Sequence, residues 1–213
     1  MSFRKKIKYY TQAPITHHVV SDVVSEYGRP NDKISELMKK GELLSIRRGL
    51  YIPGPETDLP APNSILIANH LRGPSYVSLE TALSFWGMIP ERVHEISSVT
   101  LKTTKSYDTP IGRFTYQHLN SPYYVFGIER VQLEEQQFAL IASREKALCD
   151  KIILTSGVLL RSISQTLDFL LEDMRMDEDL LVDLNLRMIA EWIEDAPKKS
   201  SLKMLVKTLE TLR

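Results

Sequence analysis

The stretch NDKISELMKKGELLSIRRGLYIP, residues 31–53, decides the fold that we predict for the first part of the chain. Its first half predicts a short helix, because Ile34, Leu37 and Met38 recur at i, i+3 and i+4 and would form one buried stripe. Its second half alternates apolar and polar residues on both sides of Gly49, as half-buried strands do. Glycine supplies the positive φ that a tight hairpin turn requires. We therefore predict a helix followed by a two-stranded hairpin.

The boundaries around this stretch agree with that prediction. Asn31 is the expected N-cap of the helix, and Gly41 stands where a glycine commonly ends one. Two further helices are predicted upstream, one with a basic face and one with a valine stripe over residues 19–24. Helix, short extended break, helix, turn, helix and hairpin is the element order of a winged helix-turn-helix. Because signals at several levels agree, we predict a winged helix-turn-helix DNA-binding domain over residues 1–54.

Charge is distributed unevenly along a chain whose formal net charge is zero. Residues 1–54 carry ten Lys/Arg against five Asp/Glu, whereas residues 163–197 carry two against ten. This asymmetry predicts an anion-binding front end and an acidic surface at the rear. The acidic surface could serve interaction with a basic partner, or it could be the solvated side of ordinary helices.

The candidate DNA contacts lie on the predicted recognition helix and at the turn of the hairpin. Lys39 and Lys40 suit phosphates, and Ser35 suits a base edge or a phosphate. Arg47 and Arg48 could reach phosphates or enter a narrow minor groove. The full set of candidate residues is Arg29, Asn31, Lys33, Ser35, Lys39, Lys40, Arg47 and Arg48.

Two carboxylates, Asp32 and Glu36, share the outward face of this helix and would repel the phosphate backbone. Arg29, Asn31 and Lys33 would then make more of the base contacts, since the amino-terminal residues of a recognition helix approach the groove. A solvated helix and a solvated turn remain the alternatives at these positions. The basic run at residues 4–8 could likewise support the DNA backbone or form a solvated helix face.

Behind the first domain the sequence predicts a second, α+β unit and a helical end. The stretch PGPETDLPAP, residues 53–62, holds four prolines without periodicity, which is typical of a stiff linker. We predict a linker over 55–62, an α+β domain over 63–160 and a helical segment over 161–213, and expect the hairpin to add nothing to the rear core. The whole chain is thus expected to be α+β, with a mixed α/β second domain. Strands are expected at 95–102, 114–119, 123–131 and 137–141, helices capped by Ser78 and Ser143, and final helices at 162–174, 179–195 and 200–212.

Two parts of the sequence resemble a known family. The stretch LMKKGELLSIRRGLYIPG (Leu37–Gly54) is similar to the end of that family's winged helix-turn-helix. The stretches SYVSLETALSFWGMIPE (Ser75–Glu91) and SREKALCDKI (Ser143–Ile152) are similar to the start and end of the domain behind it. The family is that of the AbiEi-like antitoxins of type IV toxin–antitoxin systems, often described as predicted transcriptional regulators. The resemblance covers most of residues 1–155, and the acidic helical segment after residue 160 lies outside it.

The resemblance implies both a regulator and an antitoxin. The regulator would bind double-stranded DNA at inverted repeats upstream of its own operon and repress it. The antitoxin-type domain over 63–160 would counteract a nucleotidyltransferase-like toxin, without the need for a stable complex. An alternative that the residues leave open is an interaction adaptor whose winged helix contacts a partner protein rather than DNA.

The sequence predicts neither an enzyme nor a bound cofactor or metal. It lacks the glycine-rich phosphate-binding patterns, G-x-S-x-G and C-x-x-C. His17 and His18 are adjacent, so on a helix they point about 100° apart and could not share a metal as an i, i+4 pair would. Glu145 and Lys146 are adjacent on a predicted helix and face different directions, which argues against a nuclease set. We expect Glu145 to be a first-turn acid favoured by the helix dipole.

Cys149 is the only cysteine, which points to a reducing compartment, and we expect it to be a small buried residue. No apolar run approaches the roughly 20 residues of a membrane-spanning helix. The expected location is therefore the cytoplasm, with no membrane partner.

Overall fold

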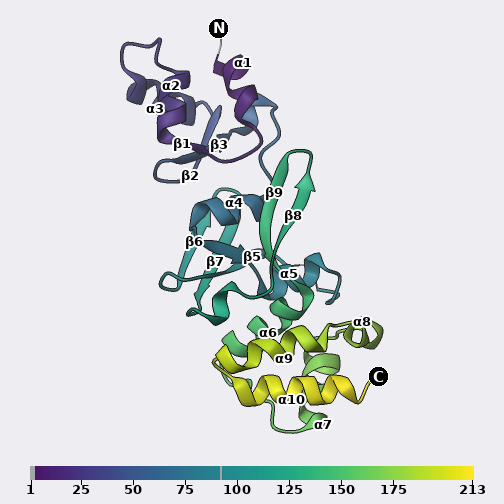
Figure 1. Cartoon of the computed structure of the whole chain (residues 1–213). Coiled ribbons are helices and arrows are strands. Elements are labelled where there is room, and N and C mark those ends of the chain that lie inside the picture. The colour runs from purple at the N-terminus through teal and green to yellow at the C-terminus, as the bar shows by residue number, and fades with distance from the viewer. Residues whose placement is uncertain (1–2, 92) are drawn as a thin grey trace.

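The computed structural model describes residues 3–91 and 93–213 and shows a mixed α+β protein with two sheets. The chain is elongated (Figure 1): a small unit of helices and strands lies at one end, a larger sheet in the middle, and the carboxy-terminal helices at the other end. The predicted α+β class is confirmed. No helix in the described ranges is long and apolar enough to cross a membrane.

The amino-terminal unit packs three helices against a three-stranded antiparallel sheet of order β1-β3-β2. Apolar side chains of the helices form one cluster with Ile15, Leu43 and Tyr51 of the sheet. A turn of 3-10 helix, Lys8–Tyr10, follows the first helix. The elements in chain order are α1 (Phe3–Ile7), β1 (Ile15–Thr16), α2 (His17–Val23), α3 (Pro30–Lys39), β2 (Leu43–Arg47) and β3 (Leu50–Pro53).

Two glycines shape this unit as predicted. Gly41, with φ +70°, follows the end of α3 and donates its N–H to the Met38 carbonyl at 3.1 Å. The next N–H, that of Glu42, reaches the Leu37 carbonyl at 3.0 Å. These two bonds are those of a Schellman motif, which satisfies carbonyls that the helix end leaves unpaired. Gly49, with φ +79°, lies in the turn between β2 and β3.

The start and the buried stripe of α3 differ from the prediction. The helix begins at Pro30 with Arg29 at the N-cap, so Asn31 is a helical residue rather than the cap. Proline suits the first turn because its missing N–H would have no partner there. Ile34 and Leu37 are buried as expected, but Met38 is 37% exposed. The stripe is therefore narrower than the sequence indicated.

Strand β3 is buried on both faces, so the prediction of half-buried strands is wrong for this strand. Tyr51 packs with the helices of the first unit. Ile46, Leu50 and Ile52 belong instead to the large cluster that continues through the middle sheet. The expectation that the hairpin adds nothing to the rear core is therefore also wrong. Thr57 in the predicted linker is buried too, and its hydroxyl donates to the Gly54 carbonyl at 2.7 Å.

The middle of the molecule is a six-stranded mixed sheet of order β6-β7-β5-β4-β9-β8. Pairs β5–β7 and β4–β9 are parallel and the others antiparallel. The strands are β4 (Ser75–Val77), β5 (Glu95–Thr100), β6 (Lys105–Thr109), β7 (Gly112–His118), β8 (Ile128–Glu134) and β9 (Gln137–Ala142), and the helices packed on them are α4 (Ser64–Leu71), α5 (Leu79–Phe85) and α6 (Arg144–Leu154).

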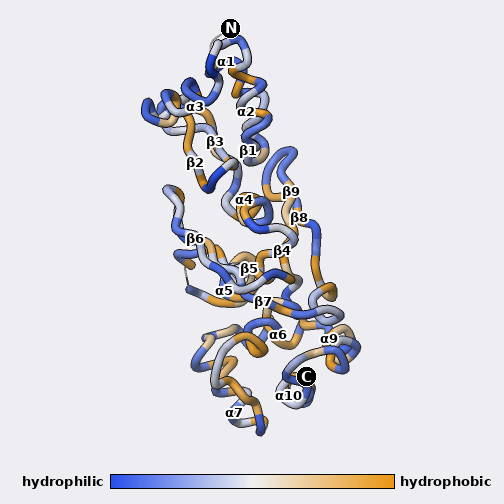
Figure 2. Tube along the Cα trace, turned by 90° about the vertical axis from the view of Figure 1, so that its left-hand side faces the viewer, coloured by the Kyte–Doolittle hydropathy of each residue, from blue (hydrophilic) through white to orange (hydrophobic). Residues whose placement is uncertain are grey.

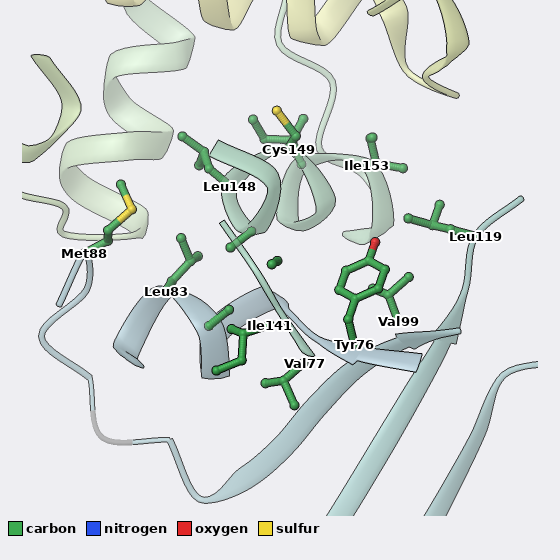
Figure 3. Packing of buried hydrophobic residues seen from close by; sticks show 14 of the residues in the cluster. Tyr76, Val77, Leu83, Met88, Val99, Leu119, Ile141, Leu148, Cys149 and Ile153 are labelled. Atoms are coloured by element: carbon green, nitrogen blue, oxygen red, sulfur yellow. The ribbon is translucent and has the colours of Figure 1, made fainter. Parts of the chain in front are cut away.

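Helices cover both faces of this sheet. On one face Tyr116 donates its hydroxyl to the Ala68 carbonyl of α4 at 2.7 Å. On the other face Tyr76 rises from β4 toward α6, and Figure 3 shows it below Cys149 and Ile153. Cys149 is fully buried, as predicted, and burial raises the pKa of its thiol.

The carboxy-terminal helices pack on α6 and share its core, so they are not a separate tail. Helix α7 runs directly into a π-helix. The helix predicted at 179–195 is divided in two, because the side chain of Asn185 caps a new helix by accepting the Met188 N–H at 3.2 Å. The helices are α7 (Ile163–Leu167), the π-helix Asp168–Asp173, α8 (Glu178–Val182), α9 (Leu186–Trp192) with a 3-10 turn at Ile193–Asp195, and α10 (Lys199–Glu210).

Three of the four predicted strands of the middle unit match β5, β7 and β9. The strand predicted at 123–131 begins only at Ile128, because Tyr123–Val125 forms a 3-10 turn. Strands β4 and β6 were not predicted. The Ser143 cap is confirmed, since its hydroxyl accepts the Lys146 N–H at 3.2 Å, whereas Ser78 stands at the start of α5 without such a bond.

Candidate nucleic-acid interface

Helix α3 presents a charged face to solvent. Its ten residues span about 15 Å at 1.5 Å per residue. At the amino-terminal end the Arg29 guanidinium lies 3.7 Å from the Asp32 carboxylate, and both side chains are well exposed. Asn31 is exposed, and its carbonyl accepts the Ser35 hydroxyl at 3.0 Å. Arg29 and Asn31 thus lie exposed at the amino-terminal end of the helix, and Ser35 lies exposed one turn after Asn31.

Glu36 forms ion pairs with two lysines of the candidate set, Lys33 and Lys40. Lys40 Nζ lies 2.6 Å from Glu36 Oε1, and Lys33 Nζ lies 3.0 Å from Oε2. The hydrogen bonds from Lys40 and then Lys33 lower the pKa of the Glu36 carboxyl. Lys33 also lies 4.8 Å from the ring centre of Tyr27. Because ion pairs at exposed sites contribute only about 0–1 kcal/mol, phosphates could still compete with Glu36 for both lysines.

Lys39 differs from its neighbours, since it forms no ion pair with any residue that the structure describes. It is exposed and lies at the carboxy-terminal end of α3. Among the lysines of the helix, Lys39 is therefore the one that can bind a phosphate without first leaving a carboxylate.

Arg47 and Arg48 are exposed in the turn between β2 and β3. His17 of α2 holds this turn in place. The His17 N–H at the start of α2 donates to the Gly49 carbonyl at 3.0 Å. The His17 ring nitrogen Nδ1 lies 3.4 Å from the Tyr51 hydroxyl. Sequence reasoning considered His17 only as a metal ligand, but the structure places it as an anchor of the turn. In both Figure 1 and Figure 2 this ribbon and α3 lie on the same side of the unit.

A buried ion pair lies inside the middle domain, and sequence reasoning missed it. Lys146 Nζ is 3.1 Å from Asp150 Oδ1, and both side chains are fully buried. The other carboxylate oxygen accepts the hydroxyls of Tyr76 at 2.9 Å and Ser78 at 2.7 Å. Lys146 also donates to the Tyr123 carbonyl at 2.9 Å and lies 3.3 Å from that ring's centre. The Lys146–Asp150 contact is ionic by distance, without hydrogen-bond geometry at Oδ1.

Removal from water shifts the pKa of both members of this pair toward their neutral forms. Burial raises the pKa of the Asp150 carboxyl, and burial lowers the pKa of the Lys146 ammonium. Their mutual attraction opposes both shifts. No bound substrate could touch either side chain without opening the core, so the pair is structural in this conformation. The sequence signal was the K-x-x-x-D spacing, which puts both residues on one helix face.

Glu145 lies in the first turn of α6, as expected, and it also has a structural contact that the sequence did not indicate. It is 8% exposed, and its carboxylate accepts the Asn185 N–H at 2.9 Å, which joins α6 to the start of α9. Within the ranges that the structure describes, no three His, Cys, Asp or Glu side chains are grouped so that they could hold a metal ion.

Comparisons with known proteins add no family assignment. The sequence matches no protein-family model, and it matches no curated protein.

Replacing Glu36 with glutamine is expected to tighten DNA binding about fivefold. The change removes a carboxylate that would repel the phosphates of a DNA bound at α3, and it releases Lys33 and Lys40 from ion pairs worth at most about 1 kcal/mol. Fluorescence anisotropy with a labelled duplex measures the affinity. The matched control is Glu194→Gln, because Glu194 also holds two lysines, at 3.3 Å each, but on the carboxy-terminal helices. Equal or weaker binding by Glu36→Gln would show that α3 does not face DNA.

Proposed function

We propose that this chain is a DNA-binding transcriptional regulator that also serves as an antitoxin of a type IV system, similar to the AbiEi-like family. One observation carries the DNA-binding part: α3 and the β2–β3 ribbon lie on one side of a three-helix, three-stranded unit, and Arg47 and Arg48 at the turn of that ribbon are exposed. The element order and the strand order β1-β3-β2 fit a winged helix-turn-helix, with α3 as recognition helix and the β2–β3 turn as wing.

In this proposal most of the exposed candidate residues contact either the bases or the backbone of double-stranded DNA. Arg29 and Asn31 lie at the start of α3, where side chains reach base edges, and arginine and asparagine pair well with guanine and adenine respectively. Lys39, and Lys40 once it leaves Glu36, would bind phosphates. The wing arginines would bind phosphates or enter the minor groove. Inverted repeats upstream of the chain's own operon are the proposed target.

The antitoxin part rests on the resemblance of residues 75–91 and 143–152. These two stretches lie together in the fold, since Tyr76 and Ser78 of the first donate to Asp150 of the second. The resembling residues thus build the core of one domain. Its proposed partner is a nucleotidyltransferase-like toxin encoded beside it, without a stable complex between them, and the proposed place of action is the cytoplasm.

The double variant Arg47→Ala/Arg48→Ala is expected to bind upstream DNA roughly 100-fold more weakly at 0.1 M salt. Each lost phosphate contact costs about tenfold under these conditions, because fewer counterions are released. The exposed arginines bury little surface, so the free energy of unfolding should change by no more than ~0.5 kcal/mol. Electrophoretic mobility shifts measure the affinity, and a cooperative melt checks folding.

The matched control removes two exposed arginines from the carboxy-terminal part of the molecule, in Arg161→Ala/Arg187→Ala, and should bind DNA as the wild type does. In cells that express the toxin and a promoter reporter, the wing variant should lose repression and still rescue growth. Loss of rescue together with repression would contradict a separate antitoxin role. Unchanged DNA binding by a folded wing variant would favour the adaptor alternative.

A further inference from the structure

A basic patch lies where the proposed wing meets the middle domain. Arg72, just after α4, donates to the Tyr107 hydroxyl at 3.3 Å and to the Thr103 carbonyl at 2.6 Å. Lys105 Nζ lies 4.9 Å from the ring centre of Tyr107. Tyr107 and Lys105 belong to β6, which is an edge strand of the sheet. Two cations from different elements therefore converge on one phenol.

The wing belongs to the same patch. The ribbon and the β6–β7 turn face one another across a cavity of about 320 Å³, lined by Leu44 and Ile52 on one side and Pro110 and Ile111 on the other. The shared core also fixes the ribbon against the middle domain. Arg47, at the end of β2, is near enough for its charge to act on Tyr107 of β6 and Tyr116 of β7.

The pKa of Tyr107 reflects the positive charges that surround its hydroxyl. Burial acts to raise that pKa, but the hydrogen bond from Arg72 and the charges of Lys105, Arg72 and Arg47 outweigh it, and the pKa is lowered. Within the described ranges none of these three cations forms an ion pair with a carboxylate. The nearest acid in sequence, Asp108, lies 3.8 Å from Arg113, and strand alternation turns it to the face opposite Tyr107.

We infer that this surface of Arg72, Lys105 and Tyr107 is a second contact for the DNA backbone, continuous with the wing. The inference rests on the proposed DNA binding and extends it to the middle domain. Figures 1 and 2 both place α3, the ribbon and β6 along the same side of the molecule. Guanidinium, ammonium and phenol hydroxyl groups are all common donors to phosphates. Five residues of strand span roughly 16 Å, which corresponds to about 5 base pairs at 3.4 Å each.

Charge reversal at Lys105 tests this surface with little risk to folding, because the side chain is exposed. Lys105→Glu should weaken binding to a 40-base-pair upstream duplex roughly tenfold and reduce the salt slope by about 0.9, the value of one phosphate contact. The DNase footprint should shorten by about 5 base pairs beside the wing. Tyr107→Phe, which removes only the hydroxyl, should shorten the footprint less. Lys207→Glu, an exposed lysine on α10 at the far end, is the matched control and should bind as the wild type does.

The outcomes separate this inference from the proposed function. If the wild type binds, the Arg47→Ala/Arg48→Ala variant fails, and Lys105→Glu keeps wild-type affinity, slope and footprint, the second contact is wrong and the winged-helix proposal stands. Equal weakening of DNA binding by Lys105→Glu and Lys207→Glu would also overturn the second contact, since net charge alone would then explain the loss of affinity. If the wild type does not bind DNA, the proposed function fails first.

Discussion

Replacing Lys146 with methionine is expected to lower the free energy of unfolding by about 3–5 kcal/mol. Methionine fills much of the lysine volume but leaves the Asp150 carboxylate fully buried without its cation. The hydroxyls of Tyr76 and Ser78 would remain as its hydrogen-bond donors, and they do not carry a compensating charge. Urea unfolding followed by circular dichroism measures the loss.

The double variant Lys146→Met/Asp150→Asn is the matched comparison. It removes both buried charges while the amide oxygen can still accept from Tyr76 and Ser78. We expect it to recover at least half of the stability lost in the single variant, because breaking a buried pair costs more than replacing it. A single variant that loses less than about 1 kcal/mol, or a double variant no more stable than the single, would show that the pair is not charged in the folded protein.

Gly54→Ala is expected to destabilise the chain by about 3 kcal/mol, the upper part of the range for overpacking. An added Cβ would lie 2.1 Å from the Gly41 carbonyl oxygen and 2.9 Å from the Glu42 carbonyl carbon. Both neighbours are backbone atoms in the segment that ends α3. The Gly54 N–H also donates to the Glu42 carbonyl at 3.0 Å, so the chain cannot move apart without losing that bond.

Gly28→Ala serves as its control, because no atom lies within 4 Å of the Cβ position there. Its melting temperature should stay near that of the wild type, while Gly54→Ala melts well below it and binds DNA less well at temperatures where the wing loosens. Equal melting temperatures for the two variants would mean that the close approach of the Gly54 and Gly41 backbones is absent in solution.

The first unit was largely predictable because its boundaries are set by local chemistry. Gly41 and Gly49 adopt the positive φ that the pattern required, and α3 begins at Pro30 and ends two residues before Gly41. The buried outer face of β3 was not predictable in this way. Whether Leu50 and Ile52 meet solvent or a second domain depends on tertiary arrangement, and the same alternation fits both.

The misses in the middle domain have a related cause. Lys and Asp are almost never fully buried unless paired, so the residue types at positions 146 and 150 did not indicate a place in the core. Strand β6, with the sequence KSYDT, is an exposed edge strand and lacks the apolar alternation that reveals a strand. Arg72, Lys105 and Arg47 lie far apart in sequence, and only the fold brings them to one phenol.

Seven of the eight predicted DNA contacts are exposed, as the sequence suggested, and two of the eight show details that the sequence could not give. Lys33 is half-buried, and Ser35 uses its hydroxyl on the Asn31 carbonyl. Pairing of Glu36 with two lysines follows from the i, i+3 and i, i+4 spacing and was readable in principle. The contact between the proposed wing and the middle domain could not be predicted from the sequence.

Salt dependence of binding is the most direct test of DNA recognition by this chain. The measurement is the affinity of the wild-type protein for a duplex from upstream of its own reading frame, by anisotropy, between 50 and 200 mM salt. Six phosphate contacts predict a loss of roughly 10³-fold across that range, with weaker binding to a scrambled duplex throughout. An affinity that does not change with salt, or no binding at 50 mM, would contradict the proposal.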